Sequence, residues 1–164
     1  MLARYLLPAA LLATVPVAFA QQAQTAAPAA TQSAAQQLSP QQQAAIAQLK
    51  QRLAQHGEQV ASQVDQGKYG DVWDGFSNVA KPVVRRDDFI KAVTADRAKL
   101  GGMASRKVAV VTLTQSKGGK LPAGLYGNVV FATQFANEKQ PVRELISFHF
   151  DSDKVWRTSG YTVH

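Results

Sequence analysis

The sequence predicts an α+β domain in which N-terminal helices pack on a four-stranded antiparallel sheet. Apolar side chains recur at helical spacing between residues 40 and 102, and after Gly102 they alternate with a period of two. The loops that join the later segments are short, which favours antiparallel neighbours. A run of helices followed by a run of strands is typical of the α+β class.

The first twenty residues have the pattern of a secretory signal peptide. Arg4 supplies a positive charge, residues 6–19 are almost entirely apolar, and Ala18 and Ala20 are the small residues that a signal peptidase reads. We therefore expect cleavage after Ala20 and a periplasmic or secreted protein without a membrane span. An uncleaved anchor is the alternative. Residues 21–40 carry no charge and no aromatic side chain, and they predict a disordered Ala/Gln-rich linker before a single domain over 41–164.

A long amphipathic helix is predicted over about residues 40–65. Ser39 is a good N-cap, Pro40 suits the first helical position, and Gly67 is a natural C-terminal stop. Apolar residues then follow at helical spacing, which predicts one buried face. These residues are Ile46, Leu49, Leu53, Val60 and Val64.

Two further helices are predicted before the sheet. A short one carries Tyr69, Trp73 and Phe76 on one side, and Pro82 interrupts the chain after it. The stretch "RRDDFIKAVTADRAKLGG" predicts the other helix, with acidic residues in its first turn and two glycines at its end.

Four strands are predicted after the helices, over residues 106–115, 125–136, 141–150 and 155–163. The last of them does not alternate regularly. A β-bulge at Ser159-Gly160 would shift its alternation by one residue, because glycine inside a strand often marks a bulge. The apolar residues would then share one side of the strand, namely Trp156, Thr158, Tyr161 and Val163.

Composition excludes several kinds of site. The chain has no cysteine, so disulfides, a lipidated cysteine, thiol catalysis and cysteine-based zinc sites are all excluded. His56, His149 and His164 lack metal-ligand spacing, and we expect neither a metal nor a cofactor. His149 is interpreted as a hydrogen-bonded sheet residue in preference to a general base. The formal charge is +7, but basic and aromatic residues do not interleave, so no nucleic-acid partner is expected.

Several stretches together resemble one bacterial exported family, the domain of unknown function 4019. They are "VDQGKYGDVW", "LPAGLYGNVVFATQFANEK", "VWRTSGYTV" and the segment "R…LGGMASRK" that contains Arg97 and Arg106. The resemblance covers about residues 50–163. It implies the curved, cone-like fold of the nuclear transport factor two-like superfamily, and it implies no known activity.

Three hypotheses about function remain open at this point. The first is a non-catalytic module that binds an unknown small molecule or a protein, since no catalytic residues converge. Its pocket would be formed by Tyr69, Trp73, Arg97, Arg106, Phe131 and Tyr161. The second is an isomerase or dehydratase that uses the hollow between helices and sheet. The third is a homodimer through the outer sheet face around Leu145, Ser147 and His149, which is compatible with either.

Overall fold

The computed structural model describes residues 38–164. The predicted signal peptide and all of the predicted linker up to residue 37 lie outside that range. In chain order the elements are α1 (Pro40–Asp65), α2 (Tyr69–Asp74), α3 (Arg86–Leu100), β1 (Met103–Ser116), β2 (Gly124–Phe135), β3 (Val142–Phe150) and β4 (Trp156–Val163). No helix in the described part is both long and apolar enough to cross a membrane.

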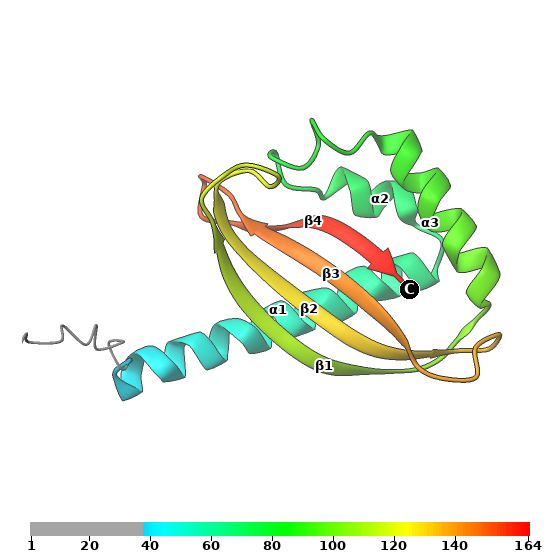
Figure 1. The fold of residues 1–164 in the computed structure, drawn as a ribbon, viewed down its shortest axis with the longest axis horizontal. Coiled ribbons are helices and arrows are strands. Elements are labelled where there is room, and N and C mark those ends of the chain that lie inside the picture. The colour runs from blue at the N-terminus through cyan, green and yellow to red at the C-terminus, as the bar shows by residue number, and fades with distance from the viewer. Residues whose placement is uncertain (1–37) are drawn as a thin grey trace, which may run out of the picture. The chain divides into compact units, whose positions relative to one another are not determined.

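The four strands form one antiparallel sheet in the order β1-β2-β3-β4. Figure 1 shows the strands side by side in a curved sheet, with α1 crossing one side and α2 and α3 near β4. The predicted α+β class is therefore confirmed. The first strand begins at Met103, three residues before the predicted start, and α2 ends at Asp74, so Phe76 follows the helix. Phe76 instead forms a parallel bridge with Thr158 at the edge of β4.

The sequence signals at both ends of α1 act as predicted. The Ser39 hydroxyl accepts from the Gln42 N–H over 3.2 Å, and the Gln42 side chain accepts from the Ser39 N–H over 2.8 Å, which completes a capping box. Pro40 occupies the first turn. Gly67 has a φ of 73°, the left-handed conformation that glycine adopts after a helix C-terminus.

One face of α1 packs closely on β2 and β3. Its residues Leu53, Val60 and Val64 are buried, as are the side chains opposite them in the sheet. Gly57 lies close against β2, since a Cβ there would lie 3.2 Å from side-chain atoms of Phe131 and Val129. The absence of a side chain at Gly57 thus sets the distance between helix and sheet.

The predicted bulge in β4 is present. Ser147 of β3 pairs with Gly160, whereas the next residue, Phe148, pairs with Thr158, so Ser159 is the extra residue. Thr158 and Tyr161 are consequently both buried on the core side. The bulge reconciles the irregular sequence of β4 with an ordinary core strand.

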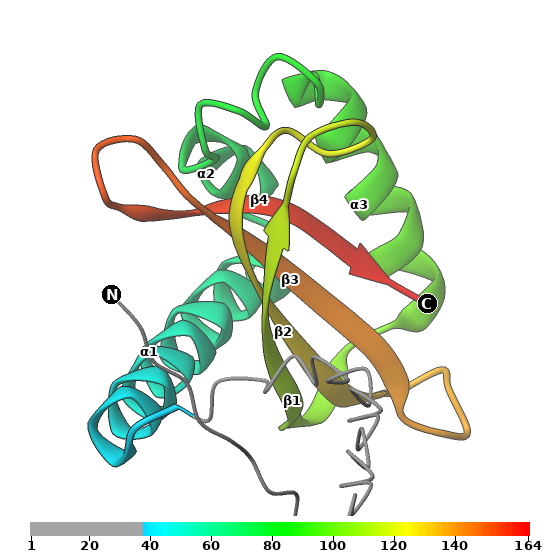
Figure 2. The same ribbon diagram turned by 60° about the vertical axis from the view of Figure 1, so that its left-hand side comes forward.

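The sheet has a second side, opposite α1, which we call the far face. Alternation along β2 and β3 places Tyr126, Asn128, Leu145 and Ser147 on it. The segment between α2 and α3, residues 75–85, lies near the β1–β2 loop at the same end of the sheet (Figure 2). Part of the far face is therefore covered by the chain itself.

Candidate functional site

A cluster of charged side chains lies between α1, α3 and the sheet. Arg106 of β1 donates from Nε to Glu144 Oε2 over 2.6 Å and from Nη1 to Asp65 Oδ2 over 2.8 Å. Arg97 of α3 donates to the other Asp65 oxygen over 2.8 Å. The guanidinium of Arg97 also stacks over the Phe135 ring, 4.5 Å from its centroid. Two arginines thus neutralise two carboxylates.

Glu144 is the most deeply buried member, with its side chain 0% exposed. Besides Arg106, its carboxylate accepts hydrogen bonds from the Thr133 hydroxyl over 2.7 Å and the Tyr161 hydroxyl over 2.8 Å. Burial and the Glu144 charge raise the pKa of Tyr161, so its hydroxyl stays protonated and donates. The oxygens of Glu144 are all engaged by the protein.

The charge state of Arg106 is equally fixed. Burial disfavours its charged form, but the hydrogen bonds to Asp65 and Glu144 outweigh that effect and hold the pKa of Arg106 above its ordinary value. The charges of the cluster balance, and of its two arginines only Arg97 has a buried nitrogen, Nη1, without a partner in residues 38–164. We interpret the cluster as a structural clamp between helices and sheet.

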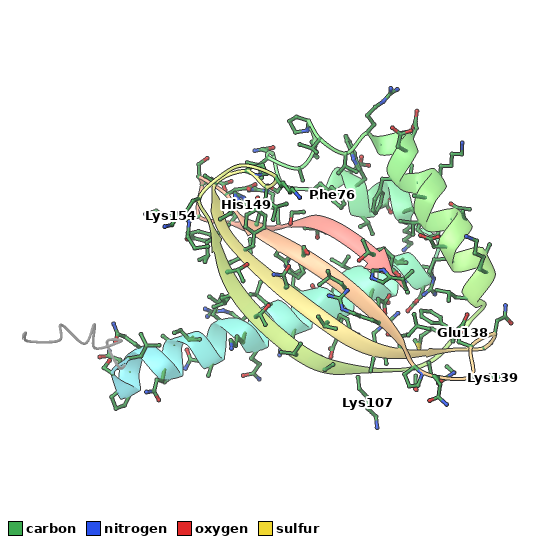
Figure 3. The ribbon with its side chains drawn as sticks, viewed as in Figure 1. Phe76, Lys107, Glu138, Lys139, His149 and Lys154 are labelled. Atoms are coloured by element: carbon green, nitrogen blue, oxygen red, sulfur yellow. The ribbon has the colours of Figure 1, made fainter. Side chains whose placement is uncertain are left out.

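A second polar cluster surrounds His149 at the opposite end of β3. Its Nδ1 lies 2.7 Å from Asp151 Oδ1, and the Ser77 hydroxyl donates to the same oxygen. Arg157 donates to the other oxygen of Asp151 over 3.1 Å. The rings of Tyr126 and His149 meet edge to face at 4.8 Å. His149 is therefore a buried, hydrogen-bonded sheet residue; Figure 3 shows it at the same end of the sheet as Phe76.

Serine, histidine and aspartate together suggest a catalytic triad, but the geometry differs from one. In a triad the serine bonds the imidazole nitrogen that the aspartate does not contact. Here Ser77 and Asp151 both lie at Nδ1, the former at 3.4 Å. The other nitrogen, Nε2, is buried without a partner in the described part of the chain, and a Cβ at Gly124 would overlap it. The arrangement is therefore not that of a Ser-His-Asp triad.

A pocket of about 220 Å³ opens on the far face between residues 79–84 and the β1–β2 loop. Its walls are mainly apolar and its floor carries the Asn128 and Ser147 side chains, which bond each other over 2.8 Å. The lining residues are Val79, Ala80, Val83, Val84, Thr114, Lys120, Leu121, Pro122, Tyr126, Asn128, Ser147, Ser159 and Gly160. An apolar hollow with a few convergent polar groups is the usual form of a ligand site.

A second hollow of about 210 Å³ adjoins the first. Val84, Ser147 and Gly160 line both of them, so the two hollows are direct neighbours, and we call the pair the far-face groove. The second hollow is completed by Phe76, Phe89, Leu145, Tyr161 and Thr162. The groove thus runs from the β1–β2 loop across β4 toward α3.

Comparison with family models gives a match over residues 56–161 to DUF4019, a family of proteins of unknown function. The matched range includes α2, α3, the first three strands and most of β4. The chain belongs to the DUF4019 family. Searches of curated proteins and of solved structures found no match.

The residues singled out in the sequence do not form one pocket in this DUF4019 domain. Arg97, Arg106 and Tyr161 come together in the charged clamp, and Arg106 also lies over the ring of the fully buried Phe131, 5.9 Å from its centroid. Tyr69 borders a separate surface hollow of about 470 Å³ beside Arg97.

Trp73 lies apart from the clamp. Its indole N–H donates to the Val84 carbonyl over 2.7 Å, and Lys81 lies over its ring.

The residues proposed for a dimer face already have contacts within the chain. His149 is buried, while Leu145 and Ser147 line the groove beneath the chain's own 75–85 segment.

The sequence interpretation missed both carboxylates of the clamp and the floor of the groove. A signal for Glu144 existed, because it shares the apolar side of β3 with Val142, Ile146 and Phe148. Asp65 and Asn128 gave no comparable signal, since a helix-terminal aspartate and a strand asparagine are ordinary surface residues.

In residues 38–164 no group of three or more histidine or acidic side chains is placed to hold a metal.

Asp151 makes the His149 cluster sensitive to acid. Burial acts to raise the pKa of Asp151, but the hydrogen bonds from Ser77, His149, Asn78 and Arg157 outweigh it and hold that pKa below 3.8. A lowered pKa in the folded state stabilises the protein at pH values above 3.8, and this contribution disappears as the pH falls through the folded-state value. We expect Asp151→Asn to cost about 1–3 kcal/mol at pH 7.

Urea unfolding of wild type and Asp151→Asn, measured from pH 7 down to pH 2, checks this expectation. The difference between the two proteins should shrink below about pH 4. Asp153→Asn is the matched control, because Asp153 is half exposed and is paired mainly with Arg157; its effect should be smaller. A pH-independent difference for Asp151→Asn would contradict the assignment.

Proposed function

We propose that this domain is an exported, non-catalytic binding module that holds a small, mainly apolar molecule in the far-face groove. The observation that carries the proposal is the groove itself. It combines apolar walls with polar groups that converge on its floor, Asn128 and Ser147.

The proposal of export is supported by residues 1–20, whose charge, apolar run and small residues follow the signal-peptide pattern. The absence of cysteine is compatible with an extracytoplasmic protein that uses no disulfides. The proposal also includes the nuclear transport factor two-like fold. The order of elements, with helices first and then a curved antiparallel sheet, supports that part of it.

The absence of catalysis is proposed because the buried carboxylates are already paired. Glu144 and Asp65 are neutralised by arginines, and Asp151 is bonded by four neighbours. General acid–base catalysis needs a group that can exchange a proton with the ligand. Among the residues that line the groove there is no carboxylate and no histidine.

Gly160 offers a direct way to test the groove. It lies where the two hollows join, and a Cβ there would approach only the Ser147 Cβ, at 4.0 Å. The strand therefore has room for a side chain at this position. A leucine would extend into the groove and fill it while the fold is retained.

The experiment titrates residues 38–164 with N-phenyl-1-naphthylamine, a neutral apolar fluorophore. We expect saturable fluorescence enhancement with wild type and its loss with Gly160→Leu. Gly102→Leu is the control, because nothing lies within 4 Å of a Cβ there and Gly102 is outside the groove. Equal binding by Gly160→Leu, or no saturable binding by wild type, would overturn the proposal.

A further inference from the structure

The only charge on the lining of the far-face groove is positive. Lys120, in the β1–β2 loop, is the only charged side chain among the lining residues of both hollows. It is exposed and forms no ion pair with any residue in 38–164. A cation beside an apolar hollow without a neighbouring carboxylate favours an anionic ligand group.

The Asn128 amide on the floor of the groove also favours an anionic ligand group. Asn128 Oδ1 already accepts from the Ser147 hydroxyl, which leaves the Asn128 amide N–H groups as donors. Lys120 and Asn128 both line the first hollow, and neither lines the second. The first hollow thus offers an ammonium and an amide donor beside the hydroxyls of Thr114, Ser147 and Ser159, and this set suits a ligand group that accepts, such as a carboxylate.

The two ends of the groove differ in polarity. The second hollow is lined mainly by apolar side chains such as Phe76, Phe89 and Leu145. Both hollows border Gly160, and the only atom within 4 Å of a Cβ placed there would be the Ser147 Cβ, at 4.0 Å. An elongated ligand would therefore lie with a polar head near Lys120 and an apolar tail near α3.

We propose that the far-face groove binds a single-chain aliphatic monocarboxylate, with its carboxylate beside Lys120 and its chain passing Gly160 toward Leu145. This inference rests on the proposed ligand-binding function and adds the chemical class and orientation of the ligand. The proposed occupant is a free molecule, because residues 79–84 of the chain itself form one wall of the first hollow.

Displacement of N-phenyl-1-naphthylamine by decanoate and by decanol, both at submicellar concentration, tests the class of ligand. These two compounds share a chain length and differ in charge. We expect decanoate to compete roughly fivefold better than decanol, which is the size of effect that one partly exposed ion pair supplies. Lys120→Gln should abolish the preference for decanoate over decanol.

Lys117→Gln is the matched control, because Lys117 lies in the same loop and does not line the groove. Lys120→Arg should keep the preference for decanoate. If wild type binds the fluorophore but does not prefer decanoate over decanol, the proposal of a carboxylate ligand is overturned and the proposed binding function stands. If the protein floats with phosphatidylglycerol vesicles and decanoate does not reduce this binding, the proposal of a free carboxylate ligand is also overturned, in favour of a lipid surface.

Discussion

Replacing Arg106 with glutamine is expected to lower the free energy of unfolding by about 3–5 kcal/mol. The side chain of Arg106 is 10% exposed and bonds both Asp65 and Glu144. Without Arg106, the two carboxylates are left with the single positive charge of Arg97. Arg97 forms its ion pair with Asp65 and not with Glu144. The Glu144 carboxylate would remain buried with hydroxyl partners and no cation, and that is costly.

Lys107→Gln is the matched control for this prediction. Lys107 is the next residue of β1, is exposed and points away from the molecule (Figure 3). Its replacement should change the free energy of unfolding by no more than about 0.5 kcal/mol. Urea unfolding followed by tryptophan fluorescence measures both variants. Similar effects at the two positions would contradict the structural importance of the clamp.

Gly57→Leu is expected to have the second largest effect. The helix approaches β2 at this residue, and even a Cβ would lie 3.2 Å from Phe131 and Val129. A leucine side chain has no room there, so α1 must move away from the sheet. Overpacking of this kind costs about 1–3 kcal/mol, and the loss of contacts along α1 adds to it.

The controls for Gly57→Leu separate packing from helix propensity. Gly57→Ala combines a tight contact with the higher helix propensity of alanine, so its net effect should stay within about 1 kcal/mol. Glu58→Leu places the same leucine on the adjacent exposed position of α1 and should be almost neutral. Thermal unfolding by circular dichroism distinguishes the three. A neutral Gly57→Leu would contradict the described packing of α1.

Local signals predicted the elements of this fold well. Ser39, Pro40 and Gly67 act on their own backbone, so the ends of α1 could be assigned from neighbours in the sequence. The bulge at Ser159-Gly160 is predictable because glycine inside a strand often marks a bulge, and a shift of one residue lets Trp156 and Tyr161 share a side. Such features depend on a few adjacent residues and on the period of the pattern.

The candidate site was less predictable, because it depends on contacts between distant residues. The sequence predicts ligand-binding roles for Arg97, Arg106 and Tyr161. In the structure these side chains bond Asp65 and Glu144 instead. Asp65 is 32 residues from Arg97, and Glu144 is 38 residues from Arg106. The far-face groove depends on how residues 79–84 fold back over the sheet. No periodicity in the sequence reports where a loop without regular structure will pack.

The charged clamp has a consequence for how the domain assembles. Arg97 pairs with Asp65 within the helical half of the sequence and Arg106 pairs with Glu144 within the sheet half, while the ion pair between Arg106 and Asp65 joins the two halves. The apolar core is shared in the same way, since it includes Leu53 and Val60 of α1 as well as Phe131 and Ile146 of the sheet. Folding of residues 38–164 is therefore cooperative, and a chain interrupted after Gly102 leaves two fragments that each lack a complete core.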